Sequence, residues 1–227
     1  MAQACIACGR APGAVQLLLA TKTVPADRIR AAVAAGERLT GENKVQELRD
    51  KAAALAGLDV ERHFIGHLQS NKVNEVLRYA SCIQSVDRLS IAAALDRKLQ
   101  AEGRALDVFV QVNTSAEASK FGLAPGDVVA FIRSLQAFHS LQLKGLMTIG
   151  LLDADPELMR PSLQRLRQVR DAVQQAVALP ATLGLSMGMS ADLEMAIAEG
   201  ATMIRVGTTI FGNRMPGKLV WNEQEGI

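Results

Sequence analysis

The segment LLLATKT, residues 17–23, contains the clearest instance of the pattern that decides the fold. Its four apolar residues in a row are typical of a strand that is buried on both faces, as strands of parallel sheets usually are. The run ends at Lys22, although an ammonium group is costly to bury. Pro25 then opens a stretch with helical spacing that Gly36 ends. The segment therefore predicts a core strand, a lysine at its carboxyl end, and a helix.

The same alternation of strand and helix repeats along the whole chain. Short apolar or β-branched runs predict strands, and the Ala-, Leu- and charge-rich stretches between them predict helices. The eight predicted strands are residues 15–21, 38–41, 63–66, 82–86, 106–113, 143–149, 183–187 and 203–208. The predicted helices are residues 26–35, 44–56, 68–79, a helix capped by Asp87 and ending at 101, a turn and helix in 122–138, 156–178 and 192–199, with only a short polar tail after the last strand. Eight alternations in about 210 residues predict an α/β protein with a closed (β/α)8 TIM barrel, in one domain over residues 1–227, rather than an open sheet.

Composition limits the classes of function that the chain can have. Its 227 residues are 49% hydrophobic, which is enough for one large core. The 25 basic and 23 acidic residues are interspersed and leave a net charge of +2, and aromatic residues make up only 4%. These features argue against binding of nucleic acids or of a membrane surface. No segment approaches the roughly 18 apolar residues of a membrane span, so a soluble protein is expected.

The three cysteines, Cys5, Cys8 and Cys82, are too few for a disulfide framework and favour a reducing compartment, the cytoplasm. Cys5 and Cys8 form a C-x-x-C sequence, but no second pair lies nearby and the terminus is expected to be loose. A closed zinc site needs four ligands, so neither a metal site nor a redox site is predicted there.

Two further patterns are given a structural interpretation. His63 and His67 are four residues apart, but the residues between them indicate a strand end rather than the helix of a zinc protease. The charged stretches ELRDK, residues 47–51, and LQRLRQVR, residues 163–170, are interpreted as charged faces of amphipathic helices. No metal ligand is predicted.

Functional residues of such a barrel lie at the carboxyl ends of its strands. Lys22 is the first of these, and an amine among apolar walls can capture an aldehyde as a Schiff base. The alternative is that Lys22 simply reaches solvent at the barrel mouth, with its stem covering apolar surface. The predicted strand ends carry the polar set Lys22, Gly41, Glu42, Asn43, Gly66, His67, Asp87, Asn113, Thr114, Met147, Thr148, Ser186, Gly188, Ser190, Arg205, Gly207 and Thr208.

The last two strand ends favour an anion. LSMGMSAD, residues 185–192, places serines and a glycine before a helix, where backbone N–H groups and the helix dipole attract negative charge. RVGTTIFGN, residues 205–213, adds Gly207 and the hydroxyl groups of Thr208 and Thr209. Each cluster alone is more typical of a turn and a helix cap than of an anion site, since Ser and Gly dominate both. Together, beside the lysine of the first strand, they indicate a site for a phosphate and an aldehyde, as in pyridoxal 5′-phosphate.

Arg205 lies two residues before Gly207 on the last strand, so both are expected on the same side of the sheet. A guanidinium facing the pyridine nitrogen of the cofactor would keep that nitrogen unprotonated and weaken its electron sink. The alternative is an ion pair between Arg205 and a carboxylate such as Glu42 or Asp87 in the barrel floor.

The chain resembles the family of pyridoxal phosphate homeostasis proteins over nearly its whole length. The resemblance rests on the following stretches, which occur in the family's order: LLATKTVP, GENKVQEL, HFIGHLQSNK, SVDRL, VQVNTSAEASKFGL, LKGLMTIG and LSMGMSADLEMAIAEGATMIRVGTTIFG. It implies an alanine-racemase-like barrel of the fold-type III class of pyridoxal-phosphate proteins. One departure is the short segment MAQACIACGR before the first strand, which implies that the family's N-terminal helix is shortened or lost.

The resemblance also implies roles for individual residues. It assigns Lys22 as the lysine that carries the cofactor, Asn43 to the cofactor pocket and Arg205 to the ring nitrogen. It assigns the phosphate to a group of residues near the last two strands: Ser186, Met187, Ser190, Gly207 and Thr208.

A carrier is expected rather than an enzyme. Racemases with this barrel have a further β-domain and a tyrosine base from the partner subunit, whereas here about 15 residues follow the last strand and the single Tyr79 falls on an outer helix. The resemblance therefore implies a monomer that stores pyridoxal phosphate, with PLP-dependent apoenzymes as recipients, guards the vitamin B6 pool and has no assigned catalytic residue. A PLP-dependent amino-acid racemase and a docking protein without a ligand remain the alternatives.

Overall fold

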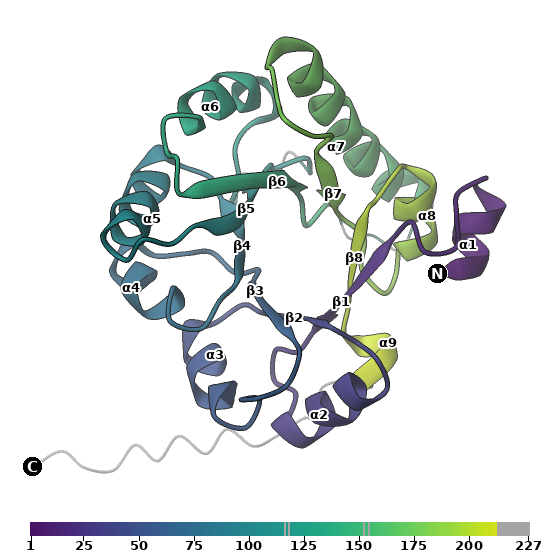
Figure 1. Ribbon diagram of the computed structural model, residues 1–227. Helices are drawn as coiled ribbons and strands as arrows, with labels where there is room; N and C mark the ends of the chain where they lie inside the picture. The colour runs from purple at the N-terminus through teal and green to yellow at the C-terminus, as the bar shows by residue number, and fades with distance from the viewer. Residues whose placement is uncertain (116, 118, 152, 154, 213–227) are drawn as a thin grey trace, which may run out of the picture.

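Eight parallel strands close into a barrel in the computed structural model, which describes residues 1–115, 117, 119–151, 153 and 155–212 (Figure 1). Each strand pairs with the next along the chain, and β8 pairs with β1 to complete the ring. The predicted (β/α)8 barrel is therefore confirmed. The strands are β1 (Gln16–Ala20), β2 (Leu39–Glu42), β3 (Glu61–Phe64), β4 (Cys82–Val86), β5 (Leu106–Gln111), β6 (Leu141–Met147), β7 (Gly184–Ser186) and β8 (Met203–Val206).

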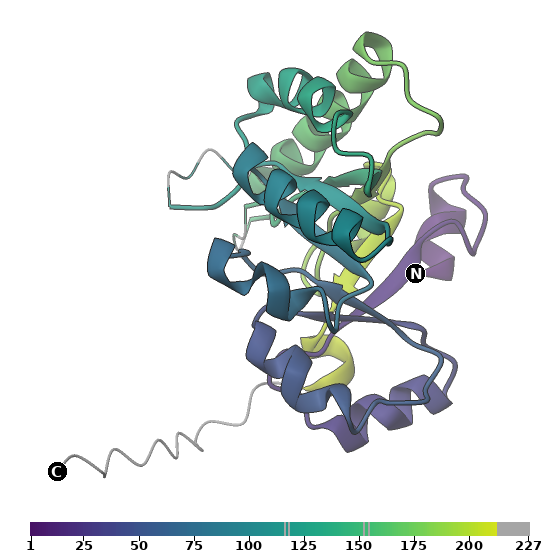
Figure 2. The same cartoon turned by 60° about the vertical axis from the view of Figure 1, so that its left-hand side comes forward.

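The helices surround the barrel and cover the outer faces of its strands (Figures 1 and 2). In α6, buried residues at 128, 131, 132 and 135 follow the spacing of one helix face, which packs into the core between helix and strand. No helix of the described ranges is both long enough and apolar enough to cross a membrane. The helices are α1 (Ala2–Ala7), α2 (Ala26–Ala34), α3 (Val45–Ala52), η1 (Ser70–Lys72), α4 (Val73–Val76), α5 (Leu89–Ala101), η2 (Pro125–Asp127), α6 (Val128–Leu135), α7 (Pro156–Ala176), α8 (Leu193–Ala198) and α9 (Thr208–Phe211).

Two kinds of core hold the barrel together. The larger one lies between the strands and the surrounding helices. The smaller one takes one residue from each of six strands and none from a helix, which places it in the barrel interior. Its members are Leu18, Leu39, Cys82, Phe109, Met147 and Met203.

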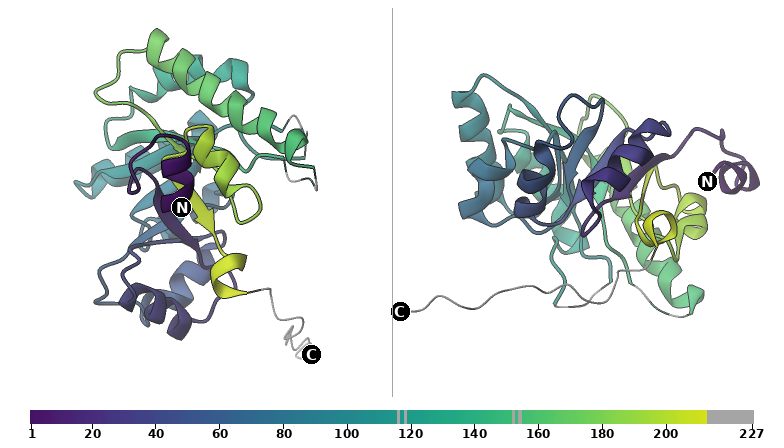
Figure 3. Two further views of the ribbon diagram at one scale, coloured as in Figure 1. Left: turned by 90° about the vertical axis from the view of Figure 1, so that its right-hand side faces the viewer. Right: turned by 90° about the horizontal axis from the view of Figure 1, so that it is seen from below.

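The two ends of the chain differ from the prediction. The N-terminal segment forms α1, a helix of six residues in which Cys5 is fully buried, so this end is not loose and its helix is short rather than lost. Helix α1 lies beside α8, and Arg10 Nη1 donates to Ile197 O at 2.8 Å (Figure 3). After β8 the chain forms the unpredicted helix α9, which lies near α2 through a hydrogen bond of 2.9 Å from Arg28 to Phe211 O. The rest of the predicted polar tail falls outside the described residues.

Two helices after the middle strands also differ from the prediction. The predicted helix over 68–79 is shorter than expected and consists of η1 followed directly by α4. Asp87 does not cap α5, because Arg88 is the N-cap residue and the helix has no side-chain cap hydrogen bond. Instead, Asp87 Oδ1 accepts a hydrogen bond of 2.6 Å from Arg88 Nη1.

The approach of β6 to β7 depends on a glycine and generates a prediction. A Cβ atom at Gly145 would lie 2.2 Å from Gly184 O and 2.7 Å from Phe109 Cε1. We expect Gly145→Ala to destabilise the protein by about 2 kcal/mol or more, because a strand backbone and a packed ring must move. Gly126→Ala is the control, since nothing lies within 4 Å of its added Cβ. Urea unfolding of both variants measures the difference, and equal midpoints would contradict this role of Gly145.

Candidate functional site

The loop after β1 presents Lys22 at the carboxyl end of the barrel. Alternation along β1 turns Leu18 into the barrel interior, and the same parity continues to Lys22, which is half-buried. The next residue, Thr23, has a φ of +64°, a left-handed conformation that is unusual for a β-branched residue. Its hydroxyl donates to Lys22 O at 2.6 Å. The backbone around the lysine thus has a defined and unusual shape.

The pairing of β1 with β8 brings the lysine strand next to the arginine strand. Leu18 is paired with Arg205 and Leu19 with Val206. One step further, a Cβ atom at Gly207 would lie 2.9 Å from Ala20 O, so the residue there has to be small. The chain therefore places Lys22 and Arg205 on neighbouring strands, as the sequence predicts.

Arg205 is almost fully buried in the barrel and is held by neutral acceptors. Its Nη1 donates to Ser186 O at 2.7 Å and to Ser186 Oγ at 2.9 Å, and its Nη2 donates to Thr148 O at 2.6 Å. Burial lowers the pKa of Arg205 to about 10, against an opposing effect of the Asp192 carboxylate. The group remains a cation at neutral pH, and its plane is fixed by three hydrogen bonds.

The alternative partners predicted for Arg205 are wrong. Glu42 pairs with Lys51, and Asp87 pairs with Arg88. The guanidinium is fixed by carbonyl and hydroxyl oxygens instead. Its charge is therefore not cancelled by an ion pair with either carboxylate.

A chain of hydrogen bonds runs from Arg205 across the barrel interior. Because Arg205 can only donate, Ser186 Oγ accepts from it and donates to Gln84 Oε1 at 2.7 Å. The Gln84 amide then donates to His63 Nδ1 at 2.7 Å. The hydroxyl group of Ser186 is thus occupied on both sides and supports Arg205.

The other predicted phosphate residues lie around the ends of β7 and β8. Met187 is fully buried in the core between strands and helices, so its side chain is not available to a ligand. Ser190 is half-buried, whereas Thr208 is exposed as the first residue of α9. Gly207 precedes it as the N-cap residue of that helix.

Asn43 lies on the loop after β2 and is exposed. The loop after β3 passes close to it, because a Cβ atom at Gly66 would lie 2.1 Å from Asn43 O. Close contact between these two loops positions Asn43 at the same end of the barrel as Lys22.

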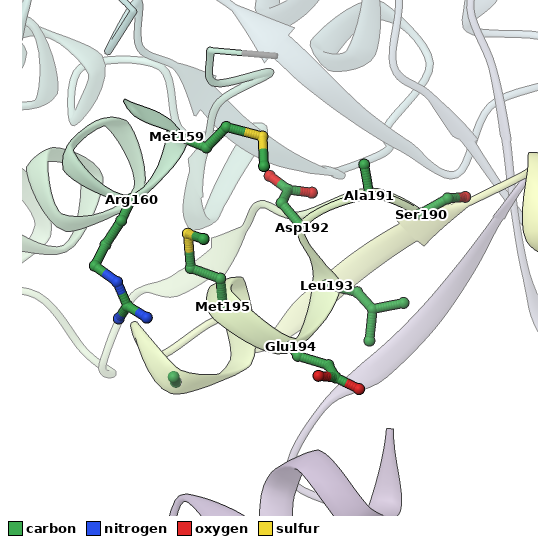
Figure 4. Close-up of a pocket in the computed structure, with 9 residues that line it drawn as sticks. Met159, Arg160, Ser190, Ala191, Asp192, Leu193, Glu194 and Met195 are labelled. Carbon is green, nitrogen blue, oxygen red and sulfur yellow. The ribbon is translucent and has the colours of Figure 1, made fainter. Parts of the chain in front are cut away.

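A pocket of about 460 Å³ lies beside the seventh strand end but is distinct from this arrangement (Figure 4). Of the predicted site residues it contains Ser190 only. Its remaining walls come from α7 and from the loop and helix around α8: Met159, Arg160, Ala191, Asp192, Leu193, Glu194, Met195 and Ala198.

The histidines and cysteines form no metal centre in the described part of the chain, where no group of three possible ligands occurs. His67 stacks on Phe121 with ring centroids 3.7 Å apart, and His63 belongs to the chain of hydrogen bonds described above. Burial raises the pKa of the Cys82 thiol well above its ordinary value.

Sequence analysis missed a buried ionic network directly behind Lys22. Lys51 Nζ donates to Glu42 Oε1 at 2.7 Å and to Glu47 Oε2 at 2.8 Å. Glu47 and Lys51 belong to ELRDK, which lies on the amphipathic helix α3 as predicted, but the side chain of Lys51 is largely buried in ion pairs that were not predicted. The signal that could have found them is their i, i+4 spacing on the helix that follows the buried Glu42.

The two carboxylates of this network titrate differently. Burial raises the pKa of Glu42 to about 7 in spite of its contact with Lys51, and Glu42 Oε2 is buried without a hydrogen-bond partner. Burial also opposes ionisation of Glu47, but hydrogen bonds from Lys51 and the Thr23 amide lower its pKa overall.

These shifts predict how stability depends on pH. The folded state holds a proton on Glu42 more tightly than the unfolded chain, so the contribution of Glu42 is largest below pH 4.5 and is lost as pH rises through 7. Between pH 5 and pH 8 we expect wild type to lose up to about 3 kcal/mol of unfolding free energy relative to Glu42→Gln. Urea titrations at each pH measure this difference.

Glu102→Gln is the control for this experiment. Its hydrogen bonds with Lys98 and Arg104 lower the pKa of Glu102, so its titration lies below the pH range tested. If Glu42→Gln and Glu102→Gln track wild type in parallel from pH 5 to pH 8, the raised pKa of Glu42 is wrong.

Comparisons with known proteins agree with the fold. The family model of the alanine racemase N-terminal domain matches residues 10–215. The pyridoxal phosphate homeostasis proteins of Pseudomonas aeruginosa and Aquifex aeolicus are 44% and 40% identical over 215 and 214 residues. These alignments cover 93% of this chain in both cases, and 90% and 92% of the two relatives.

Solved structures give the same result. The structure of PipY of Synechococcus elongatus with PLP bound is 37% identical, with a TM-score of 0.81 over 93% of this chain and 99% of PipY. Alanine racemase of Clostridium difficile is 13% identical, with a TM-score of 0.75 over 89% of this chain and 53% of the racemase, and shows the fold alone. The resemblance found in the sequence is confirmed, and this chain belongs to the family of pyridoxal phosphate homeostasis proteins.

Proposed function

We propose that this protein binds pyridoxal 5′-phosphate covalently through Lys22 and serves the homeostasis of this cofactor, and of vitamin B6, in the cytoplasm. The relatives carry the name of that function, and PipY has been solved with PLP bound. The observation that carries the proposal is the pairing of β1 with β8, which sets the strand of Lys22 against the strand of Arg205 and Gly207.

The residues at this end of the barrel fit the chemistry of the cofactor. When bound, pyridoxal phosphate supplies an aldehyde that an amine can capture and a ring that can withdraw electrons. Lys22 would hold the aldehyde carbon through its amine. Arg205 would donate a hydrogen bond to the ring nitrogen, and its fixed positive charge would disfavour a proton there.

The phosphate would lie at the ends of β7 and β8. Ser190 and Thr208 offer hydroxyl donors, and Gly207 keeps the backbone accessible beside Ala20. The backbone at Met187 forms the adjoining wall. Ser186 would act through Arg205, because both hydrogen bonds of its hydroxyl are used within the barrel.

Asn43 would complete the pocket from the neighbouring loop, where the close contact with Gly66 restricts its position.

The proposal has three further parts. The protein is a monomer, it forms a single domain over residues 1–227, and it delivers the cofactor to apoenzymes.

A two-base racemase is disfavoured by the position of the only tyrosine. Tyr79 precedes β4, at the amino end of the barrel, and packs partly buried against the core between strands and helices. The catalytic face of a (β/α)8 barrel is its carboxyl end. The chain therefore brings no tyrosine of its own to Lys22, and its curated relatives are named as homeostasis proteins.

The covalent role of Lys22 is tested by trapping. Wild type loaded with pyridoxal phosphate should be yellow, bleach with borohydride and yield a reduced adduct on the peptide that contains Lys22. Lys22→Ala should lose the adduct at this position and bind at least about tenfold more weakly, because the covalent bond is removed. Absorbance and peptide mapping measure both effects.

Lys98→Ala is the matched control, because Lys98 lies on α5 and pairs with Glu102 outside the site. It should behave as wild type. An adduct on a different residue of wild type, or none at all, would overturn the assignment of Lys22.

The racemase alternative has its own test. The loaded protein is incubated with single enantiomers of amino acids in deuterated water, and exchange at the α-carbon is followed by NMR. A carrier should show no exchange above free pyridoxal phosphate, whereas sustained exchange with loss of optical purity would favour a racemase.

A further inference from the structure

Lys51 makes three hydrogen bonds around the loop that presents Lys22. Its Nζ donates to Thr21 O at 2.8 Å as well as to the carboxylates of Glu42 and Glu47. An ammonium group has three protons, so these acceptors use its full donor capacity. The Lys51 side chain is only 14% exposed, which limits the competition from water.

These contacts reach the backbone on both sides of Lys22. On one side, Thr21 O accepts from Lys51, and the Thr21 hydroxyl donates to Glu42 Oε1 at 2.7 Å. On the other side, the Thr23 amide donates to Glu47 Oε2 at 2.7 Å. One cation is therefore linked, directly or through one carboxylate, to both neighbours of the lysine.

The contact with Glu47 also explains the unusual backbone of Thr23. A β-branched residue at a φ of +64° is unfavourable by itself and needs support from its surroundings. The charge-assisted hydrogen bond from its amide to Glu47 supplies such support. Since φ at residue 23 sets the direction in which the chain leaves Lys22, the network determines where the amine is held.

The network lies outside the barrel wall, so it does not compete with a ligand for space. Leu39 faces the barrel interior, and the alternation of β2 turns Glu42 to the opposite face, toward α3 and Lys51. Lys51 thus has no place among the residues that would touch the cofactor.

We propose that Lys51 is the positioning residue for Lys22, acting through Thr21, Glu42 and Glu47 to hold the loop in the conformation that captures an aldehyde. The capture of an aldehyde by Lys22 rests on the proposed function. The ordering of the loop by Lys51 does not, because it is a property of the protein without a ligand.

Two measurements on Lys51→Met test the proposal. In the protein without pyridoxal phosphate, hydrogen exchange of the backbone amides over 21–24 should accelerate at least about tenfold, because the loop opens locally. On mixing with pyridoxal phosphate, the hydride-trapped adduct on Lys22 should form at least about tenfold more slowly, because the amine is held less often in the reactive position.

Three further variants make these measurements specific. Lys51→Arg keeps the cation, so its amide exchange over 21–24 and its rate of adduct formation on Lys22 should both return largely to the wild-type values. Lys98→Met removes a cation that pairs with Glu102 on α5 and should match wild type in both. Glu47→Gln weakens the contact to Thr23 while keeping Lys51, so it should accelerate exchange at Thr23, and it provides the test if Lys51→Met does not fold.

The outcomes separate the two proposals. If wild type forms no adduct on Lys22, the proposed function fails, whereas the exchange measurement still decides whether Lys51 orders the loop. If wild type forms the adduct but Lys51→Met matches it in exchange and capture, the positioning role fails. It also fails if exchange rises uniformly over the whole chain, since Lys51 would then support global stability alone.

Discussion

The close pairing of β1 with β8 is the constraint on which the rest of the site depends. It closes the barrel, and Gly207 lets the two backbones approach where a Cβ atom would lie 2.9 Å from Ala20 O. Lys22 and Arg205 belong to opposite ends of the sequence, and this pairing places the strand that leads to Lys22 beside the strand of Arg205. A larger residue at position 207 would separate the strands and change the distance between amine and guanidinium.

Arg205 shows why a buried cation can be held without a carboxylate. An ion pair in the barrel would offset part of the cost of burial but would also cancel the charge that the site can use. Backbone carbonyls at residues 148 and 186 satisfy the guanidinium and leave its net charge in place. The hydrogen bond from Ser186 to Gln84, and the one from Gln84 to His63, then fix the direction of each donor. The barrel interior thus combines an apolar cluster with one polar chain of defined orientation.

Local patterns predicted the strands, most helices and the positions of Lys22 and Arg205, because alternation and strand ends are encoded within short stretches. These patterns failed where contacts with distant parts of the chain determine the local structure. Helix α9 is only one turn long, and nothing in its sequence separates it from a tail. Asp87 is of a residue type that often caps helices, yet its carboxylate accepts a hydrogen bond from the Arg88 side chain instead. ELRDK has the pattern of a charged helix face, and only the packing of α3 against the end of β2 shows that Lys51 on this face is largely buried.

In the proposed function, the Lys51 network and the buried Arg205 together would favour retention of a ligand over its chemical conversion. Lys51 would restrict the loop of Lys22 from outside the barrel, which would lower the entropy lost when the amine is captured. Arg205, with a pKa of about 10, remains charged across the physiological range, and a cation beside the ring nitrogen would disfavour the protonated ring that carbanion chemistry needs. A site with both properties would bind its cofactor without activating a substrate, which is what the proposed carrier requires.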